Sequence, residues 1–200
     1  MAAWEVAKNV GGDDLAGTYS GGGTATIGIG GTSGDARISQ DYDHLYVTFI
    51  NRNGYSAYFQ YQSVELNADL NYEYSNTMNY MQKTTAWGGT SQAFSARDGT
   101  TDGIRAFRGV YSTSNSVLAD TFGYVGFWLM DYTDDSHYQT YLAECIVPNN
   151  SSTDSQFLAS IAVGVFHESE GITYIEFKPG GLGGEYMTGT SYVVYGITGV

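Results

Sequence analysis

From residue 43 onward, apolar and polar side chains alternate with a period of two. In the first such stretch Leu45, Val47 and Phe49 share one face, while Tyr46 and Thr48 lie on the other. A period of two is the spacing of a strand with one buried face. Further stretches of this kind occupy residues 57–65, 70–81, 104–111, 122–131, 138–147, 157–166, 172–178 and 190–197.

Turn-forming residues separate these stretches, for example Asn53-Gly54, Asp98-Gly99 and Asp134-Asp135. No segment shows a helical stripe with start and stop signals. Eight or more short strands with turns between them predict an all-β fold, an antiparallel β-sandwich of a jelly-roll-like kind.

The N-terminal part differs from the rest in its glycine content. Residues 8–36 form a Gly-rich tract that contains one short β-capable stretch at residues 25–29. Such dense glycine costs much backbone entropy to order. We therefore predict a Gly-rich N-terminal arm or loop at residues 1–36, ordered against a partner, and a sandwich domain at residues 37–200.

The net charge of the chain restricts the classes of partner that it can bind. Eight Lys and Arg face 21 Asp and Glu, a net charge of −13, which repels nucleic acid phosphates and anionic lipid heads. Charged residues make up 14% of the chain, against about 25% in an average domain. With 18 Tyr, the chain has the composition of a protein contact surface or of a sheet that uses Tyr internally. The residues predicted for an interface are Trp4, Tyr19, Tyr55, Trp87 and Tyr186.

No pattern of residues predicts catalysis or a cofactor. His44, His137 and His167 have no His or Cys at ligand spacing, and Cys145 is the sole cysteine. The Asp-containing turns at residues 98–102 and 131–135 can attract calcium, but Asp is also a common turn residue. We expect no enzyme activity, no metal, no membrane-spanning run and no N-terminal secretion signal.

Four segments, taken in order, carry a resemblance to a known group. They are residues 41–50 (DYDHLYVTFI), residues 71–75 (NYEYS) with Met78 to Met81, residues 119–123 (ADTFG) followed by 125–132, and the closing pair 171–177 (GITYIEF) and 188–197 (TGTSYVVYGI). In this order and spacing the chain resembles small virion proteins of tailed bacteriophages. It departs from their pattern at Val194, at residues 130–132 and in the Gly-rich arm.

The resemblance implies a function within the virus particle. It implies a capsid decoration (cement) protein that is made in the bacterial cytoplasm and binds the outer capsid surface. The implied partners are the major capsid protein and other copies of the chain, with which it forms a homotrimer. The alternative is a head- or tail-fibre domain that recognises a host glycan, and a third hypothesis is an enzyme acting on cell-wall polysaccharide. The fold-determining positions that the resemblance implies are Asn71, Tyr72, Phe122, Tyr195 and Gly196.

Overall fold

The structure is a computed structural model that describes residues 2–18, 26–31, 34–54, 60–67, 74–83, 92–99, 104–110, 121–147, 157–179 and 185–199. Its described elements are strands and one short 3-10 turn, η1 (Gly34–Ala36). The strands are β1 (Ala3–Val6), β2 (Ala16–Thr18), β3 (Ile27–Gly30), β4 (His44–Asn51), β5 (Gln60–Leu66), β6 (Tyr74–Lys83), β7 (Gln92–Gly99), β8 (Ile104–Val110), β9 (Gly123–Met130), β10 (Gln139–Val147), β11 (Phe157–Phe166), β12 (Tyr174–Pro179) and β13 (Ser191–Thr198).

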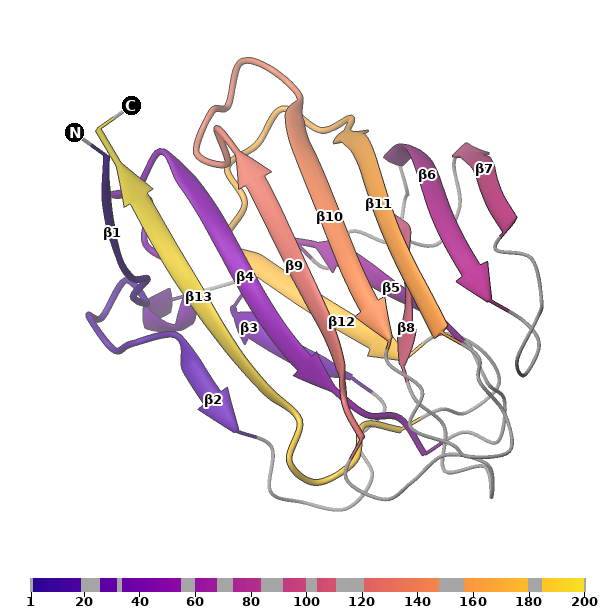
Figure 1. The fold of residues 1–200 in the computed structure, drawn as a ribbon. Coiled ribbons are helices and arrows are strands. Elements are labelled where there is room, and N and C mark those ends of the chain that lie inside the picture. Colours follow the sequence, from indigo (N-terminus) through magenta and orange to yellow (C-terminus); the bar gives the residue numbers. More distant parts are fainter. Residues whose placement is uncertain are drawn as a thin grey trace.

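Two antiparallel sheets form the molecule. The large sheet has the strand order β1-β13-β4-β9-β10-β11-β6-β7, with β2 also paired to β13, and the small sheet has the order β3-β12-β5-β8. Figure 1 shows the small sheet lying across one face of the large one. The predicted all-β sandwich is confirmed; its jelly-roll type stays a prediction.

Alternation along β4 builds the layer between the sheets. Leu45, Val47 and Phe49 are buried, whereas Tyr46 and Thr48 lie on the opposite face. Phe49 of the large sheet stacks on Phe177 of the small sheet at a centroid distance of 4.5 Å. The predicted faces of this strand are confirmed, and aromatic rings from both sheets fill the core.

Tyr186 corrects one predicted interface position. Its side chain is fully buried, and its ring meets Phe49 edge-on at 5.3 Å. An isolated bridge to Asn53 fixes its backbone beside the end of β4. Tyr186 therefore packs in the core, and the surface role predicted from sequence is wrong at this residue.

Nine of the described strands overlap stretches predicted by alternation, and β3 overlaps the β-capable stretch at 25–29. The sequence did not predict β1, β2 or β7. The predicted turn at Asp98-Gly99 is wrong, because both residues lie at the end of β7, opposite Asn76 and Ser75 of β6. Within the described residues, no helix is long and apolar enough to cross a membrane.

Three strands of the Gly-rich segment belong to the two sheets. β1 and β2 pair with β13, and β3 pairs with β12. Ala7, Leu15, Ile27 and Ile29 are buried in the core. Deletion of residues 1–36 is therefore expected to destabilise the fold. Residues 19–25 and 32–33 lie outside the described residues, so an arm formed by them stays a prediction.

Glycines lie directly beneath aromatic rings at several places. A Cβ on Gly196 would come within 2.4 Å of the ring of Tyr42, which is buried beneath β13. Similar close approaches occur between Gly17 and Tyr192 and between Gly28 and Tyr174. Part of the glycine and tyrosine content thus serves packing within the sheets.

Candidate functional site

The face of the large sheet that points away from the small sheet is the main candidate site. We call it the outer face and define it by the described outward side chains of β1, β13, β4, β9, β10 and β11. Its principal members are Trp4, Tyr195, Tyr46, Thr48, Ile50, Tyr124, Trp128, Leu142, Glu144, Ile146, Ile161 and Val163.

An aromatic cluster occupies the β1 side of this face. Strand register sets Tyr46 opposite both Tyr195 and Trp128. The rings of Tyr46 and Trp128 lie 4.4 Å apart, and Trp4 meets Trp128 edge-on at 5.2 Å. Four rings from four strands therefore form one continuous patch.

Aliphatic side chains continue the face toward β11. Ile146, Ile161 and Val163 are 50%, 47% and 50% exposed, and Ile50 is 45% exposed. Trp4 at the β1 edge is 52% exposed. Single exposed apolar residues are normal, but a contiguous apolar sheet face is typical of an interaction site.

A polar group lies within this apolar face. The hydroxyls of Tyr46 and Tyr124 are 2.5 Å apart, and they lie 3.3 and 3.4 Å from Oε1 of Glu144. All three atoms would clash with a Cβ on Gly126, at distances of 2.7 to 2.9 Å, so the bare backbone there makes room for them. Burial, the bond to Tyr124 and the Glu144 carboxylate together raise the pKa of Tyr46 above its ordinary value.

The structure places the sequence-predicted residues in different surroundings. Trp4 and Tyr195 lie together in the aromatic cluster, at a ring distance of 6.4 Å. Phe122 packs against Gly189, and Gly196 lies under Tyr42. The other predicted positions, Tyr19, Tyr55, Asn71, Tyr72 and Trp87, lie outside the described residues.

Sequence reasoning missed Glu144, Ile146, Ile161 and Val163 as surface residues. They alternate with Cys145, Ser160 and Ala162, which are buried, so the period of two was present. Both alternating sets of side chains in β10 and β11 are largely apolar, so the pattern alone does not show which set faces the core.

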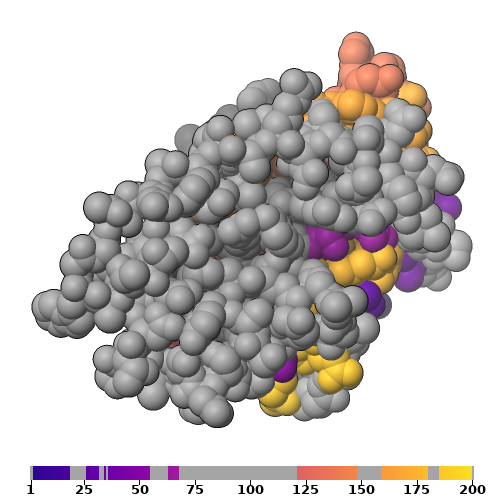
Figure 2. All heavy atoms as spheres, turned by 90° about the vertical axis from the view of Figure 1, so that its right-hand side faces the viewer, coloured from indigo at the N-terminus to yellow at the C-terminus, as the bar shows by residue number. Residues whose placement is uncertain are grey.

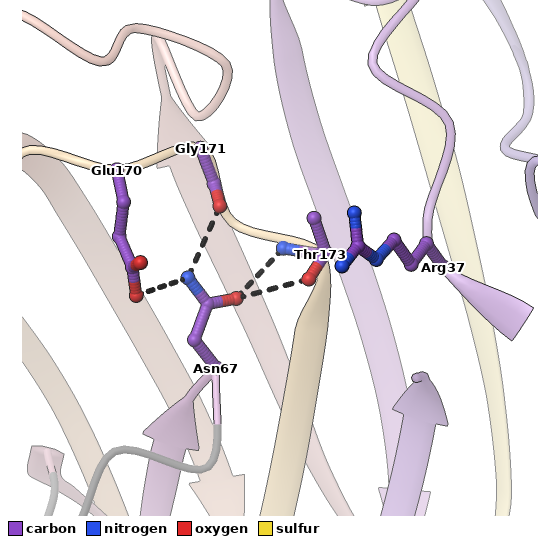
Figure 3. A pocket seen from close by; sticks show the side chains of 5 residues that line it. All are labelled: Arg37, Asn67, Glu170, Gly171 and Thr173. Atoms are coloured by element: carbon purple, nitrogen blue, oxygen red, sulfur yellow. Dashed lines mark hydrogen bonds between the residues drawn. The ribbon is translucent and has the colours of Figure 1, made fainter. Parts of the chain in front are cut away.

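A polar hollow of about 240 Å³ lies beside the end of β5, lined by Arg37, Asn67, Glu170, Gly171 and Thr173 (Figure 3). Asn67 adopts a left-handed conformation, with φ of 55°. Its Nδ2 donates to Glu170 and to the Gly171 carbonyl, and its Oδ1 accepts from Thr173 N–H at 2.8 Å. Because these bonds use the amide fully, Asn67 serves to fasten β5 to the segment that leads into β12.

The turn between β9 and β10 brings Asp134, Ser136 and His137 together. It lies at the top of Figure 2, beside the segment that leads into β12, whose Ile172 N–H donates to the Tyr132 carbonyl at 2.8 Å. Ser136 Oγ and Asp134 Oδ2 both contact Nδ1 of His137, each at 2.9 Å. A nucleophilic triad needs the two groups on different ring nitrogens, so this arrangement is a turn rather than a catalytic group. Hydrogen bonds from Ser136, and then from His137, hold the pKa of Asp134 below its usual value.

Two carboxylates flank one ammonium on the small sheet. Lys178 Nζ lies 2.5 Å from Glu65 Oε2 and 3.3 Å from Glu176 Oε2, and Glu65 is 4% exposed. Partial burial lowers the pKa of Lys178, but both carboxylates outweigh it and the net pKa is raised. A carboxylate pair for acid-base chemistry needs a substrate or water between its members, and here Lys178 occupies that place.

The remaining histidines also have partners. His44 Nδ1 accepts a hydrogen bond from the Asp131 N–H at 3.0 Å, and His167 stacks on Tyr138. Across the described ranges, no group of three His, Cys, Asp or Glu side chains could hold a metal ion. The calcium alternative at residues 98–102 lies partly outside those ranges.

Comparison with known proteins gives no match. No family model, curated protein or solved structure is similar enough to the chain to match it. The functional argument therefore depends on the chain's own residues and geometry.

Proposed function

We propose that the chain is a structural protein of a tailed-bacteriophage virion, a decoration protein that binds the outer surface of the capsid through its outer face. The observation that supports this proposal is the contiguous apolar and aromatic surface on the open side of the large sheet. The sequence resemblance described above supplies the setting, and a jelly-roll-like sandwich of the virion kind is part of the proposal.

The dimensions of the outer face suit a protein interface. Six strands spaced about 4.8 Å apart, with eight residues at about 3.4 Å each, span on the order of 600 Å² in projection. A standard interface buries about 800 Å² of accessible surface per partner, and accessible surface exceeds projected area.

Burial of the exposed apolar residues supplies the stabilisation. Trp4, Ile50, Ile146, Ile161 and Val163 are each about half exposed. Covering the second half contributes about 1 kcal/mol per side chain, or about 5 kcal/mol in all before the cost of association. In the homotrimer that belongs to this proposal, copies of the chain contact one another through surfaces other than the outer face.

Particles assembled without this chain provide the test. Purified chain is expected to bind them and to raise the temperature at which they break open. Ile161→Asp and Val163→Asp place a charge on the face that docks, and each is expected to weaken binding at least tenfold. Val10→Asp is the matched control, because Val10 is 56% exposed in a turn away from the outer face.

The result that contradicts the proposal is equally specific. If Ile161→Asp and Val163→Asp bind as tightly as the unmodified chain and Val10→Asp do, the outer face is not the docking surface. If the unmodified chain does not bind such particles at all, the decoration function is wrong.

The aromatic cluster favours a second candidate, a fibre domain that recognises a host glycan. The rings of Trp4, Tyr46 and Trp128 lie together, and the Tyr46 hydroxyl contacts the Glu144 carboxylate. Sugars bind through ring stacking combined with hydrogen bonds to their hydroxyls. A glycan array separates the two functions. Selective binding of one sugar, lost in Trp128→Ala, supports the fibre domain, whereas binding to particles alone supports decoration.

A further inference from the structure

Glu144 differs in charge from everything around it. Among the described outward side chains of β1, β13, β4, β9, β10 and β11, it is the sole carboxylate, and none is a Lys or Arg. Its cross-strand neighbours are Gly126 and Ile161, and Leu142 and Ile146 flank it along β10. One negative charge therefore lies near the middle of a surface that is otherwise easily desolvated.

Two phenol protons do not satisfy this carboxylate. Tyr46 and Tyr124 supply one hydroxyl proton each, and one of the two is used in the 2.5 Å bond between them. The other can reach Oε1 of Glu144, and no described residue donates to Oε2. A carboxylate accepts about four hydrogen bonds, so most of its capacity is filled by water while the face is open.

Covering the outer face removes that water. A desolvated carboxylate with one hydrogen bond opposes binding strongly unless the partner brings a positive charge. The occupant must therefore be cationic at this point and apolar around it.

The rings beside Glu144 select the form of the cation. The rings of Tyr46 and Trp128 lie 4.4 Å apart at 33°, and the Tyr46 hydroxyl lies 3.3 Å from the Glu144 carboxylate. A guanidinium is planar, donates two parallel hydrogen bonds to a carboxylate and stacks on aromatic rings, whereas a lysine ammonium is a compact, strongly hydrated charge.

A second copy of the chain that pairs through the same face does not supply this cation. The chain has a net charge of −13, and its described outward side chains on these six strands include no Lys or Arg. In a two-fold pairing through this face, residues near the axis meet their own copies, which brings Glu144 toward Glu144. The charge argument favours a different protein with a basic contact point.

We infer that Glu144, held by Tyr46 and Tyr124 over Gly126, binds an arginine side chain of the protein that covers the outer face. This inference rests on the proposed docking function. It adds the chemistry of the partner: an apolar protein surface with one arginine at the centre of the contact.

Titration of the full chain with small probes tests the site directly. N-acetyl-arginine amide is expected to shift the indole N–H resonance of Trp128, assigned with Trp128→Phe, along a saturable curve. N-acetyl-citrulline amide has nearly the same shape without the charge and is expected to bind at least tenfold more weakly, since a charge-assisted bond contributes about that factor. Glu144→Gln is expected to abolish the difference, and Glu185→Gln, an exposed carboxylate outside the outer face, is expected to preserve it.

Particle binding separates this inference from the function on which it rests. If the unmodified chain binds particles and Glu144→Gln binds at least tenfold more weakly, both stand. If Glu144→Gln binds as well as the unmodified chain, the arginine site is wrong and the docking function stands. Equal binding of the arginine and citrulline probes overturns the inference, as does a saturable shift with a methyl glycoside but none with arginine, which indicates a glycan site.

Discussion

Gly196→Ala tests the packing that closes the large sheet at β13. The new Cβ would lie 2.4 Å from Cδ1 and Cγ of Tyr42 and 2.6 Å from Cδ2. Ordinary contacts between carbon atoms are about 3.5–4.0 Å long. The methyl group and the ring therefore overlap by more than about 1 Å, and one of them must move.

Neither partner moves easily. Gly196 is paired on both sides, to Glu5 of β1 and Leu45 of β4, so its backbone is fixed by two ladders. Tyr42 is 5% exposed and its hydroxyl is hydrogen-bonded to Glu5. Overpacking of a fixed core site costs about 1–3 kcal/mol. We expect the upper end, about 3 kcal/mol, and a Tm lower by roughly 6–12 °C for a domain of this size.

A double-mutant cycle in urea measures the cause directly. Tyr42→Ala removes the ring and is itself expected to cost about 3–5 kcal/mol. In that background Gly196→Ala has no ring to displace, and the greater backbone entropy lost by glycine makes it neutral or stabilising by about 0.5–1 kcal/mol. The expected coupling free energy is therefore about 3–4 kcal/mol. Additive effects of the two substitutions would refute the ring overlap as the cause.

Three further predictions concern other parts of the fold. Asn67→Ala loses the amide hydrogen bonds and also places a residue that tolerates φ of 55° poorly, whereas Asn67→Gly loses the hydrogen bonds alone. Asn67→Ala is therefore expected to be about 1 kcal/mol less stable than Asn67→Gly. Equal urea midpoints of the two variants would exclude backbone strain as a contributor. Asn51 is fully buried, and neither its Oδ1 nor its Nδ2 has a hydrogen-bond partner in the structure, so Asn51→Leu is expected to raise the unfolding free energy by about 1–3 kcal/mol; a loss would show that the amide is satisfied in solution. Burial, and then Glu5, raise the pKa of Tyr42 from the ordinary value of 10.0 to about 12. The stabilisation from its neutral phenol is therefore complete below about pH 10 and is lost as the pH rises toward about 12. A urea midpoint that stays constant from about pH 9 to about pH 12 would contradict this linkage.

The sequence predicted the strands with clear alternation and missed those without it. β4 alternates between apolar and polar or aromatic residues and was placed correctly with its faces. β1 and β2 are four and three residues long and form by pairing with β13, which is a tertiary effect that local pattern does not report. Tyr186 was misplaced for a related reason, since a Tyr after a Gly-rich connection has the same local pattern whether it is buried or exposed.

The candidate site was predictable in kind but not in place. A Tyr-rich, charge-poor composition indicates a contact surface. Trp4, which was predicted for such a surface, is exposed on the outer face, and its contact role stays a prediction. The register that brings Trp4, Tyr46, Trp128 and Tyr195 together depends on strands that are far apart in the chain. The surroundings of Glu144 likewise depend on Gly126, which lies opposite it on β9. A single sequence does not specify that pairing.

The composition of the central strands connects the fold with the proposed function. β9 (GYVGFWLM) and β11 (FLASIAVGVF) contain no charged residue, so apolar side chains lie on both of their faces. Strands with this composition are ordinarily covered on both sides. In this molecule the small sheet covers one side, and on the other Ile161 and Val163 remain about half exposed. We therefore expect the second cover to come from another molecule. Under the proposed docking function, substitution of Ile161 or Val163 is expected to weaken particle binding far more than it destabilises the isolated domain.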